Sequence, residues 1–315
     1  MKISVIIPTL SRPEDLLICL NAIAKNTRQP DEVIIVEQGD VEKTRQIANK
    51  CILPIEVIFL SIKSSSKARN TGFEMCNGDV IAYIDDDVEI ADNYLEVAEQ
   101  YFSDSKNDSV LGIVGKDLVR SQQKKRLTDY MRQIVGVLFC RSTFGYKSVV
   151  LISGQNVLRN IADKQQSVEW IQGVGVWRRT AFQNHQYDER MVRWCFGEDV
   201  MFSYQHHYRQ PGCLWYVPEL NFFHNESQVN RIFNVQATRM MIIYRYIFWK
   251  ECIYQDKLVR VFPYVWSQLG FSVIEIVAHP SKQTVRTLYQ TYKYLWRNRI
   301  EIECGVCNFN EFIFK

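Results

Sequence analysis

The sequence lacks a strong excess of charge of either sign. Its 38 Lys and Arg residues against 35 Asp and Glu residues give a formal net charge of +3. Because neutralising many backbone phosphates needs a dense positive surface, this balance argues against general nucleic-acid binding. The 315 residues are 47% hydrophobic and 13% aromatic. That is enough apolar surface for one large globular domain or two unequal ones, and it excludes collagen, coiled coils and disorder.

The sequence also lacks the marks of export. Its N-terminal apolar run is six residues long and ends at Pro8, too short for a signal-peptide core, and no cleavage site follows. The nine cysteines fall inside apolar runs and do not have the spacing of a disulfide scaffold. We therefore expect a protein of the reducing cytosol, in the cytoplasm or at the inner face of the membrane.

Short β-branched runs alternate with segments of helical spacing in the first 118 residues. The predicted strands are Ile3 to Pro8, Glu32 to Val36, Ile55 to Leu60, Asp79 to Ile84 and Val110 to Val114. The predicted helices are Glu14 to Ile23, Val41 to Asn49, Ser66 to Cys76 and Asn93 to Phe102. This alternation predicts an α/β fold with a parallel sheet wrapped by helices. Ligands of such sheets lie beyond the carboxyl ends of the strands, here in the loops that begin at Pro8, Glu37, Ser61 and Asp85.

The pattern changes twice further along the chain. After about residue 118 it is less regular, and from about residue 230 it is helical, aromatic and basic. We predict a first domain over residues 1–230, divided into halves 1–118 and 119–230, and a helical extension over residues 231–315. The extension holds 12 basic and 6 acidic residues, a net +6, which leaves −3 on the rest.

The first predicted loop has no glycine-rich phosphate motif. Pro8, Thr9 and Arg12 stand there, which argues against a dinucleotide fold, a P-loop and a sugar-nucleotide pyrophosphorylase.

Three carboxylates, Asp85, Asp86 and Asp87, follow the fourth predicted strand. Adjacent carboxylates repel one another, and Mg²⁺ or Mn²⁺ would relieve that repulsion while bridging to phosphate oxygens. The alternative is a solvated acidic turn that caps the next helix.

Two other loops carry residues suited to a nucleotide. Lys67 and Arg69 stand at a predicted helix start, where they could meet a diphosphate or only decorate a capped surface helix. Glu37 ends the second strand, where its carboxylate could accept a hydrogen bond from a nucleobase or lie in a solvated turn.

The second half offers a candidate base and a candidate ligand. Glu198 and Asp199 begin a helix in apolar surroundings, as a helix cap or as a general base whose pKa desolvation raises. His224 follows two phenylalanines, as a metal ligand or as a buried imidazole.

Several motifs in order resemble glycosyltransferase family 2, the inverting enzymes built on the GT-A fold. They are residues 4–9 with Arg12 and Pro13, residues 68–72, residues 84–87, Gly173 with residues 177–179, residues 187–189 and residues 197–199. The resemblance covers about residues 1–224. It implies a Rossmann-like, mostly parallel sheet flanked by helices, with a nucleotide-sugar-binding half at 1–118 and an acceptor half at 119–230.

The resemblance also implies a role for individual residues. Thr9 and Glu37 would contact the nucleobase, Asp85 the nucleoside, Asp87 and His224 the metal, and Asp199 would be the catalytic base. Pro8, Arg12, Lys67, Arg69 and Asp86 would line the donor site, and Trp177 and Glu198 the acceptor site.

The expected reaction moves a hexosyl group from a UDP-, dTDP- or GDP-sugar to a glycan or lipid-linked acceptor with Mn²⁺ or Mg²⁺, as in polysaccharide biosynthesis. The alternative is a catalytically silent GT-A module that binds nucleotide sugar or a partner enzyme.

The segment Val261 to Ala278 is apolar and carries one charge, Glu275. It also contains Pro263 and Gly270, and a spanning helix needs about 20 mostly apolar residues. Three arrangements stay open: a membrane span, a buried or paired helix, and an interfacial helix whose basic aromatic flanks meet headgroups. Peripheral membrane contact through residues 231–315 would suit a lipid-linked acceptor.

Overall fold

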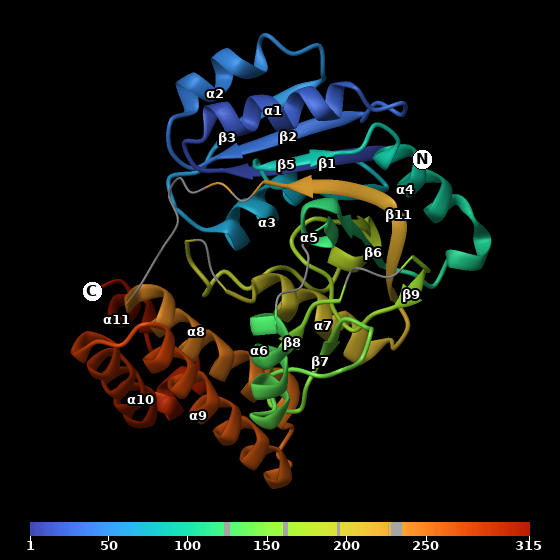
Figure 1. The fold of residues 1–315 in the computed structure, drawn as a ribbon. Helices are drawn as coiled ribbons and strands as arrows, with labels where there is room; N and C mark the ends of the chain where they lie inside the picture. The colour runs from blue at the N-terminus through green and yellow to red at the C-terminus, as the bar shows by residue number, and fades with distance from the viewer. Residues whose placement is uncertain (123–126, 160–162, 194–195, 226, 228–234) are drawn as a thin grey trace. The chain divides into compact units, whose positions relative to one another are not determined.

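The structure is a computed structural model that describes residues 1–122, 127–159, 163–193, 196–225, 227 and 235–315 (Figure 1). The chain divides into two compact units. The first unit comprises Met1–Gln123, Arg159–Trp194 and Glu198–Arg231, and the second comprises Lys124–Leu158, Cys195–Gly197 and Ile232–Lys315. The sequence pattern places residues 124–158 in the first domain, whereas their contacts group them with the C-terminal helices.

The first unit is built on a nine-stranded mixed sheet. Its strands are β1 (Ile3–Thr9), β2 (Glu32–Glu37), β3 (Ile55–Phe59), β4 (Val80–Tyr83), β5 (Val88–Ile90), β6 (Gly112–Asp117), β9 (Gln166–Ser167), β10 (Gly175–Arg178) and β11 (Leu214–His224). The strand order is β3-β2-β1-β4-β10-β6-β11-β5, and β9 pairs with β11. The α/β fold with a Rossmann-like core is confirmed.

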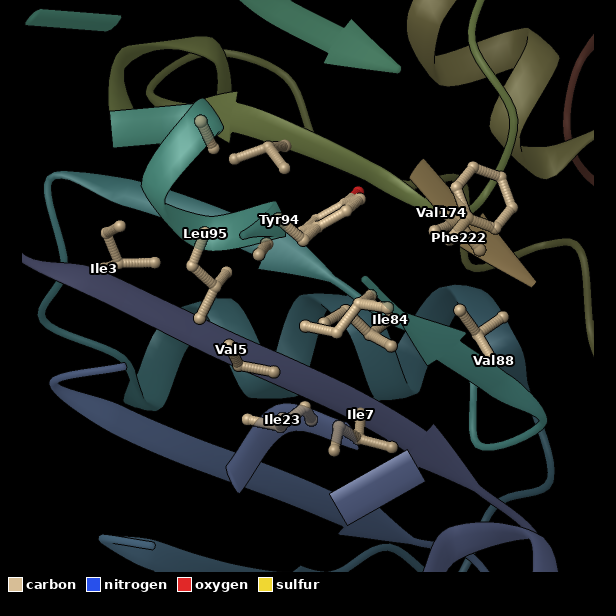
Figure 2. Close-up of a cluster of buried hydrophobic side chains, with 14 of the residues drawn as sticks. Ile3, Val5, Ile7, Ile23, Ile84, Val88, Tyr94, Leu95, Val174 and Phe222 are labelled. Atoms are coloured by element: carbon tan, nitrogen blue, oxygen red, sulfur yellow. The ribbon is translucent and has the colours of Figure 1, made fainter. Parts of the chain in front are cut away.

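Helices cover both faces of this sheet. They are α1 (Pro13–Ala24), α2 (Val41–Ala48), α3 (Ser65–Met75), α4 (Tyr94–Ser103), α5 (Leu118–Gln122) and α7 (Glu198–Arg209), with short 3₁₀ turns η1 (Ser105–Asn107) and η2 (Arg179–Phe182). Figure 1 shows α1 and α2 on one side of the sheet and α3 on the other. Alternate residues of β1 point to opposite faces. Ile3, Val5 and Ile7 pack against α1 and α4 (Figure 2), whereas Ile6 packs towards α3.

The sheet is mixed rather than parallel throughout, because β5, β9 and β10 run against the other strands. β1 to β4 are parallel, but β10 lies antiparallel between β4 and β6. The predicted fifth strand, which is β6, is therefore not hydrogen-bonded to the fourth, β4, because β10 separates them. Val176 and Trp177 make this insertion favourable, because both are buried in the core on opposite faces of the sheet.

The strand order reverses at β1, since β2 lies on one side of it and β4 on the other. Loops leaving the carboxyl ends of two such strands turn to opposite faces and leave a crevice, where doubly wound sheets bind ligands. The loops after Thr9 and Tyr83 meet at this point.

The second unit is mostly helical, as predicted for the C-terminal extension. It contains α6 (Leu127–Leu138), α8 (Val235–Phe248), the π-helical turn η3 (Trp249–Tyr254), the 3₁₀ turn η4 (Leu258–Arg260), α9 (Val261–Ala278), α10 (Lys282–Glu303) and α11 (Phe309–Phe314), with the hairpin β7 (Val149–Val150) and β8 (Asn156–Val157). Leu258–Ala278 is long and apolar enough to cross a membrane by length and composition.

Candidate metal and catalytic site

Two carboxylates and an imidazole converge at the carboxyl end of β4. Asp85 and Asp87 follow β4, and His224 ends β11. β11 pairs antiparallel with β5, which places His224 opposite Val88 and beside Asp87. One ligand atom from each of Asp85, Asp87 and His224 lies within 4.8 Å of the others. The register of a distant strand therefore completes the site that the three aspartates begin.

Asp87 is held as an anion. Burial by itself would raise its pKa, but the hydrogen bond and charge of His224, at 3.2 Å between Nε2 and Oδ1, and the backbone N–H of Ser227, at 2.8 Å from Oδ2, lower that pKa to about 2. Burial works against protonation of His224, yet Asp87 raises the pKa of His224 above its ordinary value. A divalent cation that bound here would take the place of the proton that His224 Nε2 shares with Asp87.

The donor set fits a divalent cation. Two carboxylate oxygens and one imidazole nitrogen suit Mn²⁺, and the carboxylates suit Mg²⁺. Asp85 and His224 keep 27% and 21% of their side chains exposed, so one side of the cluster is open to solvent and to oxygen ligands from a diphosphate.

The middle aspartate faces away from this cluster. Asp86 accepts hydrogen bonds from the Thr9 hydroxyl at 2.6 Å and from Arg12 Nη1 at 2.9 Å. Burial raises the pKa of Asp86 to about 7, although Arg12 and Thr9 favour its ionised form. Asp86 therefore ties the loop after β1 to the loop after β4, and Thr9 and Arg12 are engaged in that tie.

Glu37 is fully buried rather than open to a ligand. Its Oε1 accepts hydrogen bonds from the backbone N–H groups of Ser11 and Gly39, and its Oε2 accepts one from the Thr44 hydroxyl at 2.6 Å. The carboxylate shapes the loops at the ends of β1 and β2. Contact of Thr9 or Glu37 with a nucleobase stays a prediction.

Arg69 connects the metal cluster to the candidate base. Its Nη2 donates to Asp85 Oδ1 at 2.8 Å, and its Nη1 donates to Glu198 Oε1 at 3.1 Å. The side chain is 4% exposed, and a Cβ placed on Gly173 would stand 2.7 Å from Nη2. A glycine at position 173 leaves room for this guanidinium, which explains why the sequence motif has glycine there.

Asp199 lies next to this bridge, at the start of α7. Burial and the adjacent charge of Glu198 raise its pKa to about 7, against the effect of Arg69 and of the Val200 backbone N–H, which donates to Oδ1 at 2.8 Å. A carboxylate with this pKa is a stronger base than an ordinary aspartate, and about half of it is ionised at neutral pH.

The remaining predicted site residues have structural partners. Pro8 is buried within β1. Lys67 Nζ pairs with Glu189 at 2.9 Å, so contact with a diphosphate would require it to leave that partner. Glu198 is bonded to Arg69 and to the Ser65 hydroxyl, and it faces the protein rather than an acceptor.

Trp177 was expected at the acceptor site, and its place in the structure argues against that role. It is 1% exposed and packs edge-on against Phe202 and Phe182. The tryptophan is part of the core between the sheet and α7. The surrounding motif predicts that Trp177 binds the acceptor. Its place in the short strand β10 indicates instead that the side chain is buried in the core.

Sequence reasoning missed two supports of the site. Gln38 accepts a hydrogen bond from the Ser64 backbone N–H at 2.6 Å, which joins the loop after β2 to the start of α3. The Ser227 N–H on Asp87 comes from a segment 140 residues away along the chain. Backbone donors leave no mark in side-chain patterns, so neither motif nor composition could indicate Ser227.

The model of the family described as glycosyl transferase family 2 matches residues 4–165, more than half of the chain. The protein belongs to this family.

The curated relatives match over part of their length. Glycosyltransferase AglE of Haloferax volcanii is 30% identical over 118 residues, which are 36% of this chain and 39% of AglE. Poly(ribitol-phosphate) β-N-acetylglucosaminyltransferase TarS of Staphylococcus aureus is 26% identical over 135 residues, 40% of this chain and 24% of TarS. These matches therefore span less than half of either relative.

Solved structures agree in fold. The crystal structure of S. aureus TarS 1–349 in complex with UDP-GlcNAc superposes with a TM-score of 0.60 over 92% of this chain and 79% of that chain, at 13% identity. The GT-A fold inferred from the sequence motifs is confirmed.

Proposed function

We propose that the protein is an inverting, metal-assisted glycosyltransferase that moves a hexosyl group from a nucleotide sugar to a hydroxyl of a glycan or lipid-linked acceptor. The observation that carries this proposal is the buried Arg69 bridge. It holds Asp85 of the candidate metal cluster and Glu198, the neighbour of the candidate base, on one guanidinium. Transfer needs a leaving-group site and a base at a fixed separation, and this bridge supplies a rigid link.

The donor side of the reaction belongs to the carboxyl edge of β1 and β4. Asp85, Asp87 and His224 would hold Mn²⁺ or Mg²⁺, which supplies charge neutralisation to the leaving nucleoside diphosphate. The Thr9–Asp86–Arg12 network keeps the two loops at this edge in place. UDP-sugars are the first donors to test, because the TarS structures that share this fold were solved with UDP and UDP-GlcNAc.

Asp199 provides the proton acceptor. An acceptor hydroxyl is a poor nucleophile, and Asp199 would remove its proton as the oxygen attacks the anomeric carbon from the face opposite the diphosphate. The new glycosidic bond forms as the bond to the diphosphate breaks, which inverts the configuration at that carbon. We place this reaction in the cytoplasm or at the inner face of the membrane.

The second candidate is a catalytically silent module that binds nucleotide sugar or a partner enzyme. It would need the donor site but not the base. The raised pKa of Asp199 favours the enzyme, because a helix cap would have no need of a desolvated carboxylate.

The proposal is tested by nucleoside diphosphate release and sugar incorporation with UDP-, dTDP- and GDP-sugars in Mn²⁺. We expect Asp199→Asn to lower turnover by about 10²- to 10⁴-fold, the contribution of a positioned base, with donor affinity unchanged. Asp163→Asn is the matched control, because Asp163 is 90% exposed and pairs only with Lys116 among the contacts described. Wild-type turnover in Asp199→Asn would remove this residue from the mechanism, and donor binding without turnover in the native protein would favour the silent module.

A further inference from the structure

One side of α9 presents apolar residues to solvent along its whole length. Their side chains recur at helical spacing and are between 39% and 75% exposed: Phe262, Val265, Leu269, Val273, Ile276 and Val277. We call these six residues the outer face of α9. Soluble monomers seldom leave so continuous an apolar stripe uncovered, because burying it would be favourable.

The opposite side of α9 carries the polar groups of the helix and packs within the second unit. Ser267 and Gln268 are buried there. Arg141 Nη1 donates to the Ser267 carbonyl at 3.2 Å, and the Tyr292 hydroxyl of α10 donates to the Gln268 carbonyl at 3.2 Å. Polar side chains of α9 thus face the protein and its apolar side chains face outward. A surface helix of a soluble protein has the opposite arrangement.

The C-terminal end of α6 extends the apolar surface. Phe139 stacks on Trp266 with ring centroids 5.2 Å apart, and Trp266 Nε1 donates to the Leu138 carbonyl at 2.8 Å. Gly270 allows this approach, because a Cβ there would stand 2.4 Å from Phe139. α6 has its own exposed apolar stripe at helical spacing: Leu127, Tyr130, Met131, Ile134 and Leu138.

The segment that holds α9 and α10 is strongly basic. Residues 257–300 contain seven basic residues and one acidic residue, Glu275, a net +6. Four of the cations are exposed on α10, namely Lys282, Arg286, Lys293 and Arg297. Lys293 and Arg299 lie over the rings of Tyr289 and Trp296, both well exposed, so aromatic and basic groups alternate along α10.

We propose that the outer face of α9, with the stripe of α6, is an interfacial membrane-binding surface for anionic lipid. An apolar stripe that enters the boundary between headgroups and acyl chains, with cations beside it, is the pattern of helices that lie in the membrane plane. This inference concerns the second unit by itself and does not depend on the proposed reaction. Lipid binding and sugar transfer can therefore succeed or fail separately.

The same observations decide against a spanning helix. A span needs every side of the helix to tolerate lipid, whereas Ser267, Gln268 and Glu275 would place three polar side chains in the hydrocarbon. They also favour lipid over a second copy of the chain, because a self-complementary contact would bring the +6 regions of two copies together.

The test is co-sedimentation of the full chain with phosphatidylcholine vesicles, with and without phosphatidylglycerol, at low and high salt. We expect binding to the anionic vesicles that weakens with salt. Leu269→Glu should lower the partition coefficient about tenfold or more, because a charge replaces a side chain that would insert. Ile52→Glu, at a fully exposed site of the first unit, is the matched control and should bind as the native protein does.

A charge variant tests the electrostatic part. Neutralising Lys282, Arg286, Lys293 and Arg297 to Gln should weaken binding by about fivefold per cation in contact with the surface. The same net change made at Lys2, Lys25, Lys50 and Lys106, all exposed in the first unit, should have a smaller effect. Circular dichroism and thermal unfolding of each variant separate lost binding from lost folding.

Three results would overturn the inference. The first is equal and negligible binding to both vesicles at low salt. The second is a concentration-dependent dimer that Leu269→Glu dissociates, which would assign the face to a second copy. The third is protein that stays with the vesicles after carbonate extraction, which would indicate a span.

Discussion

Asp199 differs from an ordinary aspartate because of what surrounds it. Burial and Glu198 disfavour its ionised form, and Arg69 partly offsets them, so its pKa is about 7. The base must be ionised to accept a proton. The ionised fraction therefore falls about tenfold for each pH unit below that pKa, and activity is present above pH 7 and lost as the pH falls.

We therefore expect the pH profile of kcat to have its inflection near pH 7 and to reach a plateau about one pH unit higher. Glu198→Gln should move the inflection to lower pH, because it removes the neighbouring negative charge and leaves Arg69 free to stabilise the Asp199 anion. The measurement is kcat between pH 5.5 and 8.5 for both proteins. A flat profile, or an inflection that Glu198→Gln leaves in place, would contradict the assignment.

At the residue scale the sequence could indicate which side chains are able to bind a metal or a proton, but not which groups contact them. The carboxylates at the end of β4 and the start of α7 were predictable, because strand and helix patterns place them. Their environments were not. Arg69 and Glu198 are 129 residues apart along the chain, and Thr9 and Asp86 are 77 apart. Only the folded structure shows that these groups are hydrogen-bonded to one another inside the protein.

α3 carries Arg69 to the site and depends on close packing against the sheet. Gly72 lies on the buried side of α3, where a Cβ would stand 2.4 Å from Ile6 Cγ2 in β1. Ile6 is fully buried and has little room to move. We expect Gly72→Ala to lower the free energy of unfolding by about 1–3 kcal/mol, the usual cost of overpacking.

Urea unfolding of Gly72→Ala measures this effect. The control is Gly145→Ala in the second unit, where the nearest neighbour of the added Cβ, Thr143, lies at an ordinary 3.7 Å. Equal stability of Gly72→Ala and the native protein would show that α3 has room to shift, and the close-approach argument would then be wrong.

The Arg69 bridge joins α3 to the loop after β4 and to α7. Lysine keeps the charge but cannot present two parallel donors, so Arg69→Lys should keep one carboxylate partner and lose the other. We expect kcat to fall by tenfold or more and the unfolding free energy to fall by about 1.5–3 kcal/mol, the worth of a hydrogen bond to a charged group.

A double-mutant cycle with Glu198→Gln separates the bridge from general damage. Residues in direct contact should show a coupling energy of about 0.5–3 kcal/mol. Lys67→Gln is the control, because Lys67 lies on the same helix as Arg69 and its ion pair with Glu189 is partly exposed, so the effect should be small. Additive effects of Arg69→Lys and Glu198→Gln would contradict the bridge.

The order of elements was predictable where neighbours in sequence are neighbours in space. β1 to β4 with α1 to α4 follow the alternating pattern within a few residues at each end. β10 was not predictable, because an antiparallel strand inserted between β4 and β6 depends on contacts that no local period encodes. The same holds for the pairing of β11 with β5, which brings His224 to Asp87.

The whole molecule combines a GT-A unit with a basic helical unit that exposes apolar residues. The sequence left three arrangements open for Val261 to Ala278, because a stretch of this composition suits each of them. The structure distinguishes the two sides of α9, and that distinction leads to the interfacial surface proposed above.

The central claim is that the first unit binds a nucleotide through a divalent cation at Asp85, Asp87 and His224. Its most direct test is thermal unfolding with UDP, dTDP or GDP, each with Mn²⁺ or with EDTA, for the native protein, Asp87→Ala and the control Asp163→Ala. A ligand at about 100 times its Kd stabilises the native state by about 2.7 kcal/mol, which raises the Tm by several degrees. The account predicts such a rise with one nucleotide and Mn²⁺, kept in Asp163→Ala and lost in EDTA and in Asp87→Ala. An unchanged Tm in every combination, or a rise that Asp87→Ala retains, would contradict it.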